Sequence, residues 1–229
     1  TVYKTIDQGL NWEPIKVITN SNRIALAVTP ASPEHLYLLS SRGAVDILRQ
    51  SSFNGIYKST DSGDNFELMA DSPNILGWRS NGSDLKGQGH YDLAITVNPN
   101  NANTLYVGGI NIWRSGDGGN NWDIQTRYAD RINNGEDHYQ DPSLQEVHAD
   151  QHTLEWNNGI LFVVNDGGIY KRLNNGIWVD ISGNLAISQM HRIGISQLDN
   201  QALSGLQDNG VEKRDPNGLW FEQSYYFAD

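Results

Sequence analysis

Apolar and β-branched residues recur along this chain in short runs that match the length and alternation of β-strands. Residues 23–28 and 91–97 are two such runs. Each is followed by a turn rich in Pro or Asn and then by a second run, at residues 35–39 and 104–107. Alternation with a period of two residues, ended by turn residues, is typical of strands. Since no stretch of convincing length has the period of a helix, the pattern predicts an all-β protein with many short strands.

One short motif occurs three times between these runs. Residues 5–12, 59–66 and 115–122 share the pattern Ser/Thr-x-Asp-x-Gly-x-Asn-Trp/Phe, and the aromatic positions are spaced by 66 − 12 = 54 and 122 − 66 = 56 residues. A fixed period in this range indicates a repeat architecture. We expect the motif to hold a turn together and not to carry chemistry. Its structural residues are Asp7, Gly9, Trp12, Asp61, Gly63, Phe66, Asp117, Gly119 and Trp122.

Two weaker copies of the motif lie at residues 169–178 and 211–220, each shortened by one residue. Neither shows the acceptor Asp at its expected position, so we expect these two turns to be looser. Each unit contains two runs before the motif, one entering it and one leaving it, which predicts four-stranded antiparallel blades of a β-propeller. The prediction is a single module over residues 1–229, with a half-blade at 1–18 and blades at about 19–71, 85–127, 147–182 and 190–229.

The motif resembles the Asp-box, or BNR, repeat of sialidase-like, xyloglucanase-like and sortilin-like β-propellers. Residues 147–152, 165–170 and 207–210 are similar to sortilin-like (VPS10-like) repeat proteins among bacterial secreted and surface proteins. The resemblance implies that the box Asp accepts hydrogen bonds from turn N–H groups and that the box Gly has a positive φ. It also implies that the box aromatic packs between blades, and that the protein is secreted or lies at the bacterial cell surface.

The blade count predicts an incomplete ring. Residues 1–18 supply only the third and fourth strands of a blade, so the chain contains about four and a half blades. We therefore expect a fragment of a larger propeller, whose remaining blades belong to the same or another chain. Exposed edge strands would result unless other polypeptide covers them.

The long insertions predict a binding surface. In a four-stranded meander, residues 41–54, 70–89 and 125–146 all fall on the face opposite the Asp boxes, which we call the long-loop face. Long loops on a rigid scaffold are where binding function concentrates. Aromatic and polar residues on these loops suit stacking against sugars and hydrogen bonding to them, although the aromatics could instead only pack their own loops. The candidate binding residues are Trp78, Arg79, Tyr128, His138 and Tyr139.

The pattern His-x-Asp-x-His at His148, Asp150 and His152 is the strongest candidate for a metal site. Alternate residues of a strand share a face, so these side chains are expected to point together. Two imidazoles and a carboxylate could bind zinc or another divalent ion and leave an open position. A hydrogen-bonded His–Asp network is the alternative interpretation of the same residues.

Asp166 and Asp208 occupy equivalent positions in two units, five residues before Lys171 and Lys213. Two carboxylates at the same height could serve as acid and base in glycoside hydrolysis. The alternative is that both residues only form turns, since Asn-Asp-Gly-Gly and Gln-Asp-Asn-Gly are strong turn sequences. The Arg-Ile-Pro start implied by a sialidase resemblance is not found at Arg23 or Arg192.

Composition excludes several classes. The formal net charge is −11, which disfavours binding to nucleic acid, and the absence of cysteine excludes disulfides and thiolate metal sites. No apolar run is long enough to span a membrane. We therefore expect a propeller module that binds a polysaccharide or a protein partner through the long-loop face. A glycoside hydrolase that uses Asp166 and Asp208, and a structural repeat within a large surface or secretion complex, are the alternatives.

Overall fold

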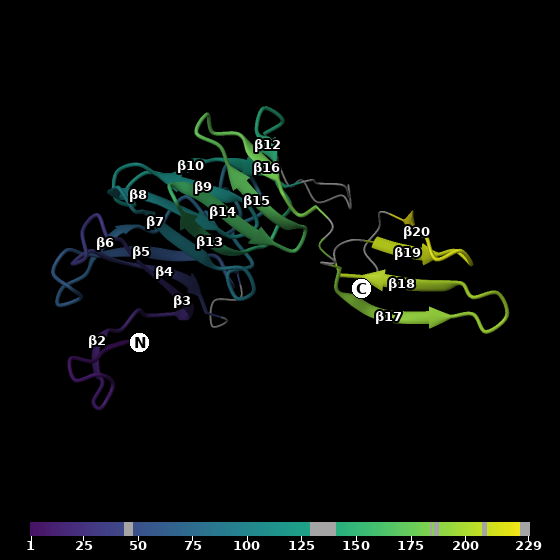
Figure 1. Ribbon diagram of the computed structural model, residues 1–229. Helices are drawn as coiled ribbons and strands as arrows, with labels where there is room; N and C mark the ends of the chain where they lie inside the picture. Colours follow the sequence, from purple (N-terminus) through teal and green to yellow (C-terminus); the bar gives the residue numbers. More distant parts are fainter. Residues whose placement is uncertain (44–47, 129–140, 184, 186–187, 208–209, 225–229) are drawn as a thin grey trace.

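The computed structural model describes residues 1–43, 48–128, 141–183, 185, 188–207 and 210–224 of the chain. Four four-stranded antiparallel sheets follow one another along the sequence, as the all-β prediction requires (Figure 1). They are preceded by a two-stranded half-blade of β1 (Val2–Lys4) and β2 (Glu13–Lys16). The predicted architecture of about four and a half propeller blades is thus confirmed. The described part of the chain contains no helix long and apolar enough to cross a membrane.

In every blade the strands are hydrogen-bonded in chain order. The first blade consists of β3 (Ser21–Val28), β4 (Leu36–Arg42), β5 (Phe53–Ser59) and β6 (Glu67–Ala70). The second consists of β7 (Ala94–Asn98), β8 (Asn101–Gly108), β9 (Ile112–Ser115) and β10 (Asp123–Ile124). The third consists of β13 (Gln151–Asn157), β14 (Ile160–Asn165), β15 (Gly168–Arg172) and β16 (Trp178–Asp180). The fourth consists of β17 (Met190–Ile195), β18 (Ala202–Leu206), β19 (Gly210–Arg214) and β20 (Trp220–Ser224).

A small parallel sheet lies between the second and third blades. It pairs β11 (Thr126–Arg127) with β12 (Gln145–Glu146), at the two ends of the insertion that the sequence predicted as one long loop. An ion pair between Arg127 Nη2 and Glu146 Oε2, at 3.1 Å, joins the same two strands. This pairing anchors the base of the insertion to the propeller.

Each complete Asp box is closed by a fixed set of hydrogen bonds. In the box of the first blade, Asp61 Oδ1 accepts from the Asn65 backbone N–H at 2.9 Å, and Asp61 Oδ2 accepts from Asn65 Nδ2 at 2.7 Å. Ser59 Oγ accepts from the Gly63 N–H at 2.9 Å, where Gly63 has a φ of +89°. The side-chain hydrogen bond from Asn65, followed by the backbone one, lowers the pKa of Asp61 to about 2. Asp7 and Asp117 accept the equivalent bonds in their own boxes.

The two weaker boxes differ from each other. In the fourth blade, Asp215 Oδ1 accepts from the backbone N–H groups of Asn217 and Leu219, each at 2.9 Å. The expectation that this box lacks an acceptor Asp is therefore wrong, because Asp215 takes that role from a shifted position. In the third blade an amide replaces the carboxylate, since Asn175 Oδ1 accepts from the Ile177 N–H at 3.1 Å.

The core lies between consecutive blades. Strand β3 lies beside β7, and β7 lies beside β13, so the first strands of three blades are neighbours. The boxes of the first and second blades pack against the preceding unit: a Cβ on Gly63 would lie 3.1 Å from Ile15, a Cβ on Gly119 would lie 3.2 Å from Ile56, and Trp122 is 8% exposed. The predicted packing of the box aromatic does not hold for Trp12, which is 59% exposed because no described residue forms a blade on that side.

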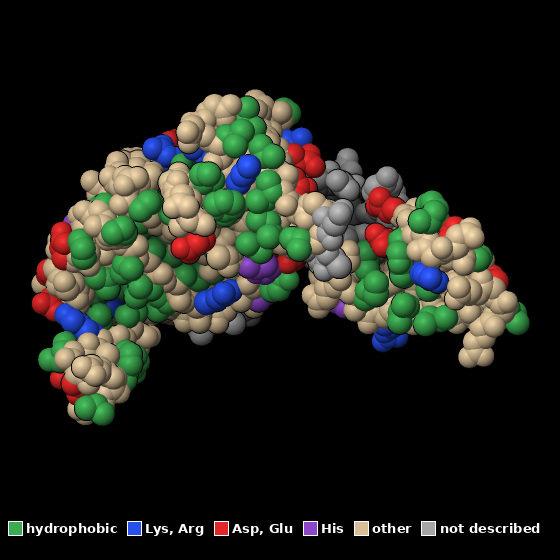
Figure 2. Space-filling model, in the orientation of Figure 1, with side chains coloured by type: hydrophobic (Ala, Val, Ile, Leu, Met, Phe, Trp, Pro, Cys, Tyr) green, Lys and Arg blue, Asp and Glu red, His purple; other side chains and the backbone are tan. Residues whose placement is uncertain are grey.

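The fourth blade is the least covered. Figure 1 shows the sheet of β17–β20 to one side of the other three blades, and every residue of β17 is exposed. Ile193 and Ile195 remain 52% and 67% exposed. Figure 2 shows hydrophobic side chains across this blade. Its apolar surface is thus open to solvent within the part of the chain that the structure describes.

Candidate functional site

The insertion at residues 70–89 lies beside the described ends of the insertion at residues 125–146, which are residues 125–128 and 141–146. The buried side chain of Asn111 joins them, since its Nδ2 donates to the Trp78 carbonyl and its Oδ1 accepts from the Tyr128 N–H, both at 3.0 Å. A second link runs from the Asp141 N–H to Ser80 Oγ at 2.9 Å. These bonds fix residues 78–80 of the first insertion against the described ends of the second.

The loop at residues 71–93 is also organised internally. Asn74 Oδ1 accepts from the Phe53 N–H at 2.9 Å, and Asn74 Nδ2 donates to the carbonyls of Asp84 and Lys86 at 3.0 and 2.8 Å. Arg79 Nε lies 3.8 Å from Asp84 Oδ1. Because its polar groups are bonded within the loop and to strand β5, this segment is a structured surface and not a loose tether.

The candidate binding residues fall into two groups. Trp78, Arg79 and Tyr128 are half-buried on the two linked loops. His138 and Tyr139 lie outside the described residues. The structure therefore brings Trp78 and Tyr128 near one another through Asn111, while their role in binding stays a prediction.

Three side chains from neighbouring blades form a hydrogen-bonded group beside these loops. His152 Nε2 lies 2.6 Å from Asp166 Oδ1, and the Tyr91 hydroxyl donates to Asp166 Oδ2 at 3.1 Å. The rings of Tyr91 and His152 also meet edge to face, with centroids 5.1 Å apart. Both Asp166 oxygens are thus engaged, and the Asp166 side chain retains 14% exposure.

A buried pair of carboxyl groups lies next to this group. Asp92 is fully buried and Asp150 is 7% exposed. Neither Asp92 oxygen has a hydrogen bond partner within the described ranges, whereas Asp150 Oδ1 accepts from Gln88 Nε2 at 3.0 Å. Burial, together with repulsion from the Asp150 carboxylate, raises the pKa of Asp92 to about 9. Asp92 therefore carries a proton at neutral pH.

The predicted alternation of His148, Asp150 and His152 along one strand is wrong. Strand β13 begins only at Gln151, and Asp150 has a φ of +62°, which breaks the alternation. His148 Nδ1 lies 3.2 Å from the Ala149 carbonyl, and His152 is bonded to Asp166. Among the described residues, no group of three His, Cys, Asp or Glu side chains is arranged to hold a metal ion.

The predicted pairing of Asp166 with Asp208 stays a prediction, since Asp208 lies outside the described residues. Asp166 is more than a turn residue, because the turn itself is closed by Asn165 Oδ1, which accepts from the Gly167 N–H at 3.1 Å. The sequence-based site missed Tyr91, Asp92 and Gln88. A signal for Asp92 was available, since residues 90–92 align with residues 148–150 in the next unit.

Similarity to known proteins is limited to the fold. No protein-family model matches the chain, and no curated protein matches it. Among solved structures, a GH74 enzyme from Niastella koreensis matches with a TM-score of 0.51 and 20% identity over 96% of this chain. A structure of YCF48 bound to D1 peptide matches with a TM-score of 0.46 and 13% identity, again over 96% of this chain.

The chain spans 33% of the length of the GH74 enzyme and 60% of that of YCF48. At these identities the matches show the fold alone. The chain is an all-β protein of four-stranded propeller blades with Asp-box repeats, and it is structurally similar to part of the propeller of larger proteins.

Proposed function

We propose that this chain is a binding module that captures a polysaccharide or a protein partner through its long-loop face. The observation that carries this proposal is that Asn111 joins the first long loop, at Trp78, to the described beginning of the second, at Tyr128. A surface that is ordered before binding loses less conformational entropy when a ligand arrives. Trp78 and Tyr128 supply the amphipathic aromatic surface that recurs at binding hot spots.

Substitutions of two tryptophans on opposite faces of the propeller, one as the test and one as the control, check this proposal. Trp78→Ala should weaken capture on a glycan array or in a pull-down with candidate partners by about tenfold or more, as expected for an aromatic anchor. Trp12→Ala is the matched control, because Trp12 is 59% exposed on the Asp-box side. Equal loss in both variants, or retained capture with Trp78→Ala at an unchanged melting temperature, would contradict the proposal.

A second candidate function is glycoside hydrolysis, and Asp166 favours it. Its carboxylate is partly exposed and is oriented by His152 and Tyr91. A carboxylate held in this way suits a general base or a nucleophile, with Asp208 as the proposed partner. Turnover of a polysaccharide that is abolished in Asp166→Asn would support this candidate, and turnover that survives the change would remove Asp166 from it.

A divalent ion at His148, Asp150 and His152 remains a separate proposal. Binding would require His152 to leave Asp166 and the three side chains to turn toward one another. Elemental analysis of the purified chain should then find a stoichiometric ion that is lost when His148 and His152 are both changed to Ala. Location outside the cell or at its surface is likewise proposed from the Asp-box resemblance, and fractionation of the producing cell would test it.

A further inference from the structure

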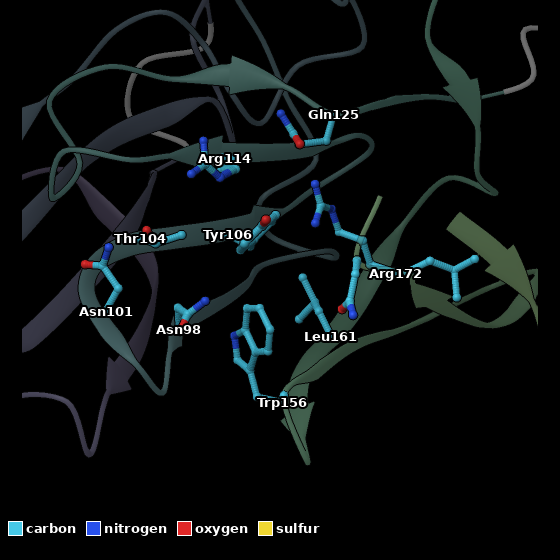
Figure 3. A pocket seen from close by; sticks show the side chains of 12 residues that line it. Asn98, Asn101, Thr104, Tyr106, Arg114, Gln125, Trp156, Leu161 and Arg172 are labelled. Atoms are coloured by element: carbon cyan, nitrogen blue, oxygen red, sulfur yellow. The ribbon is translucent and has the colours of Figure 1, made fainter. Parts of the chain in front are cut away.

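A cavity of about 400 Å³ opens between the second and third blades (Figure 3). Its lining includes Tyr106 and Arg114 from the second blade and Trp156 and Arg172 from the third. Three turns also contribute to it: the turn between β7 and β8, the turn between β13 and β14, and the shortened box turn of the third blade. The described candidate binding residues Trp78, Arg79 and Tyr128 do not line this cavity, so it is a separate site.

The corresponding space between the first and second blades is filled. There Lys58 Nζ donates to Asn103 Oδ1 at 2.9 Å, and the Tyr37 hydroxyl donates to the Ala102 carbonyl at 2.8 Å. The Lys58 ammonium group also lies 5.6 Å from the centre of the Tyr37 ring. A tyrosine and a cation of the first blade are thus both occupied by the turn of the second.

Tyr106 and Arg114 occupy the same strand positions one blade later. Tyr37 is the cross-strand partner of Lys58, and Tyr106 is the cross-strand partner of Arg114. The next equivalent pair is Phe162 with Lys171. The first blade presents an aromatic and cationic pair to the second blade. The second blade presents an equivalent pair to the third blade.

The third blade lacks the groups that would occupy this pair. Asn103 lies three residues before Tyr106, and Gly159 lies three residues before Phe162. Where the second blade has an amide side chain, the third has none, and a Cβ on Gly159 would have no atom within 4 Å. The third blade's box is also one residue shorter. These two differences leave the space open.

The cavity is cationic in an acidic protein. The chain has 27 acidic and 16 basic residues, yet two arginines and no Asp or Glu line this space. Within the described ranges, neither Arg114 nor Arg172 forms an ion pair. Arg172 Nε is buried without a hydrogen bond partner, and its guanidinium carbon lies 5.7 Å from the centre of the Tyr106 ring. Two guanidinium groups without carboxylate partners are suited to an anionic ligand.

We propose that this cavity binds a carboxylated saccharide, such as a uronic acid unit of an acidic polysaccharide. Arg114 and Arg172 would hold the carboxylate, because the guanidinium fork matches its two oxygens. The half-buried ring of Trp156 provides apolar surface for a sugar ring, and its centroid lies 5.9 Å from that of the buried Tyr106 ring. The amides of the lining can both donate to and accept from sugar hydroxyls. They are Asn98, Asn101 and Gln125. An acidic peptide shares the carboxylate but has no comparable array of hydroxyl groups for these amides.

Calorimetric titration of the 229-residue chain with tetragalacturonate tests the proposal. Arg114→Gln and Arg172→Gln should each weaken binding by at least about tenfold, since each removes charged hydrogen bonds to the carboxylate. Lys58→Gln is the matched control, because Lys58 occupies the same strand position in the filled interface and should leave binding unchanged. Trp78→Ala should also leave it unchanged, which separates this site from the long-loop face.

Gly159→Asn tests the origin of the cavity. Asn tolerates positive φ better than other residues with a side chain, and Gly159 has a φ of +76°. The new amide would extend from the turn between β13 and β14, which lines the cavity together with Arg114, so we expect it to narrow the space. We expect loss of tetragalacturonate binding with a melting temperature close to that of the unchanged chain.

Four results would overturn the proposal. The first is no binding of tetragalacturonate at millimolar concentration. The second is equal affinity for neutral cellotetraose, which would show that charge does not matter. The third is a loss in Lys58→Gln as large as in Arg114→Gln. The fourth is tighter binding of a tetraglutamate peptide than of tetragalacturonate, which would make the cavity a peptide site.

Discussion

The interface between the first and second blades is filled, whereas the interface between the second and third blades contains a cavity. Both are built from the same strand positions, with Tyr37 and Lys58 in one and Tyr106 and Arg114 in the other. The first pair bonds to the turn of the next blade, and the second pair lines open space. In this repeat protein, a missing amide side chain and one shortened turn thus distinguish a candidate binding site from a packing contact.

A similar contrast exists at the long-loop end of the same interfaces. Arg23 Nη1 donates to the Tyr91 carbonyl at 2.6 Å and joins the first blade to the second. Between the second and third blades, Asp92 and Asp150 meet as a buried carboxyl pair. The second interface thus carries buried or cationic polar groups at both ends, which is where function tends to reside in an otherwise regular scaffold.

The largest expected effect comes from breaking the filled interface. Tyr37→Ala should lower the free energy of unfolding by about 3–5 kcal/mol, because a fully buried aromatic ring and its interblade hydrogen bond are lost together. Urea unfolding followed by tryptophan fluorescence measures this change. A loss below about 1 kcal/mol would mean that the first and second blades are not held together by this contact.

A smaller effect of opposite sign is expected from Asp92. Its pKa is about 9 in the folded chain, compared with 3.8 for the ordinary group. Below about pH 4 both folded and unfolded chains hold the proton; as the pH rises, only the unfolded chain releases it, so Asp92 increasingly disfavours folding. Asp92→Asn should therefore stabilise the chain by about 1 kcal/mol or more at pH 8, and the gain should disappear near pH 4. Melting temperatures of both proteins across this pH range provide the measurement, and a gain that does not vary with pH would contradict the assignment.

The smallest effect distinguishes the two tyrosines directly. Tyr37→Phe removes the hydroxyl bonded to Ala102 and should cost about 0.5–1.5 kcal/mol. Tyr106→Phe should cost less than about 0.5 kcal/mol, since its hydroxyl has no hydrogen bond within the described part of the chain. Paired urea titrations measure both values. Equal costs would show that the hydroxyls of Tyr37 and Tyr106 do not differ in hydrogen bonding between the two interfaces.

Much of the architecture could be predicted because the repeated motif has a regular spacing along the sequence. The motif spacing and the alternating runs located the four blades and the half-blade, and the boxes at Asp7, Asp61 and Asp117 have the bonds that the resemblance implied. The shifted acceptor Asp215 was missed, because a turn shortened by one residue changes which side chain reaches the backbone.

The candidate site was less predictable. His148, Asp150 and His152 were expected on one strand, but Asp150 has a positive φ, and its buried carboxyl group accepts from Gln88, which lies 62 residues away in sequence. The partners of Asp166 are His152 and Tyr91, and Tyr91 lies 75 residues away in sequence. Such contacts depend on how blades stack, and no local pattern encodes them.

The sequence by itself determined the fold class, the blade count and the turn chemistry of the boxes. Each of these depends on interactions within a few residues or on a regular period, so the pattern of residue types suffices. Only the tertiary structure showed that the second and third blades enclose a cavity lined by two arginines that form no ion pair with any described residue. The physical reason is that a cavity depends on what neighbouring blades fail to fill, and Gly159 is significant only because Arg114 stands across from it in another blade.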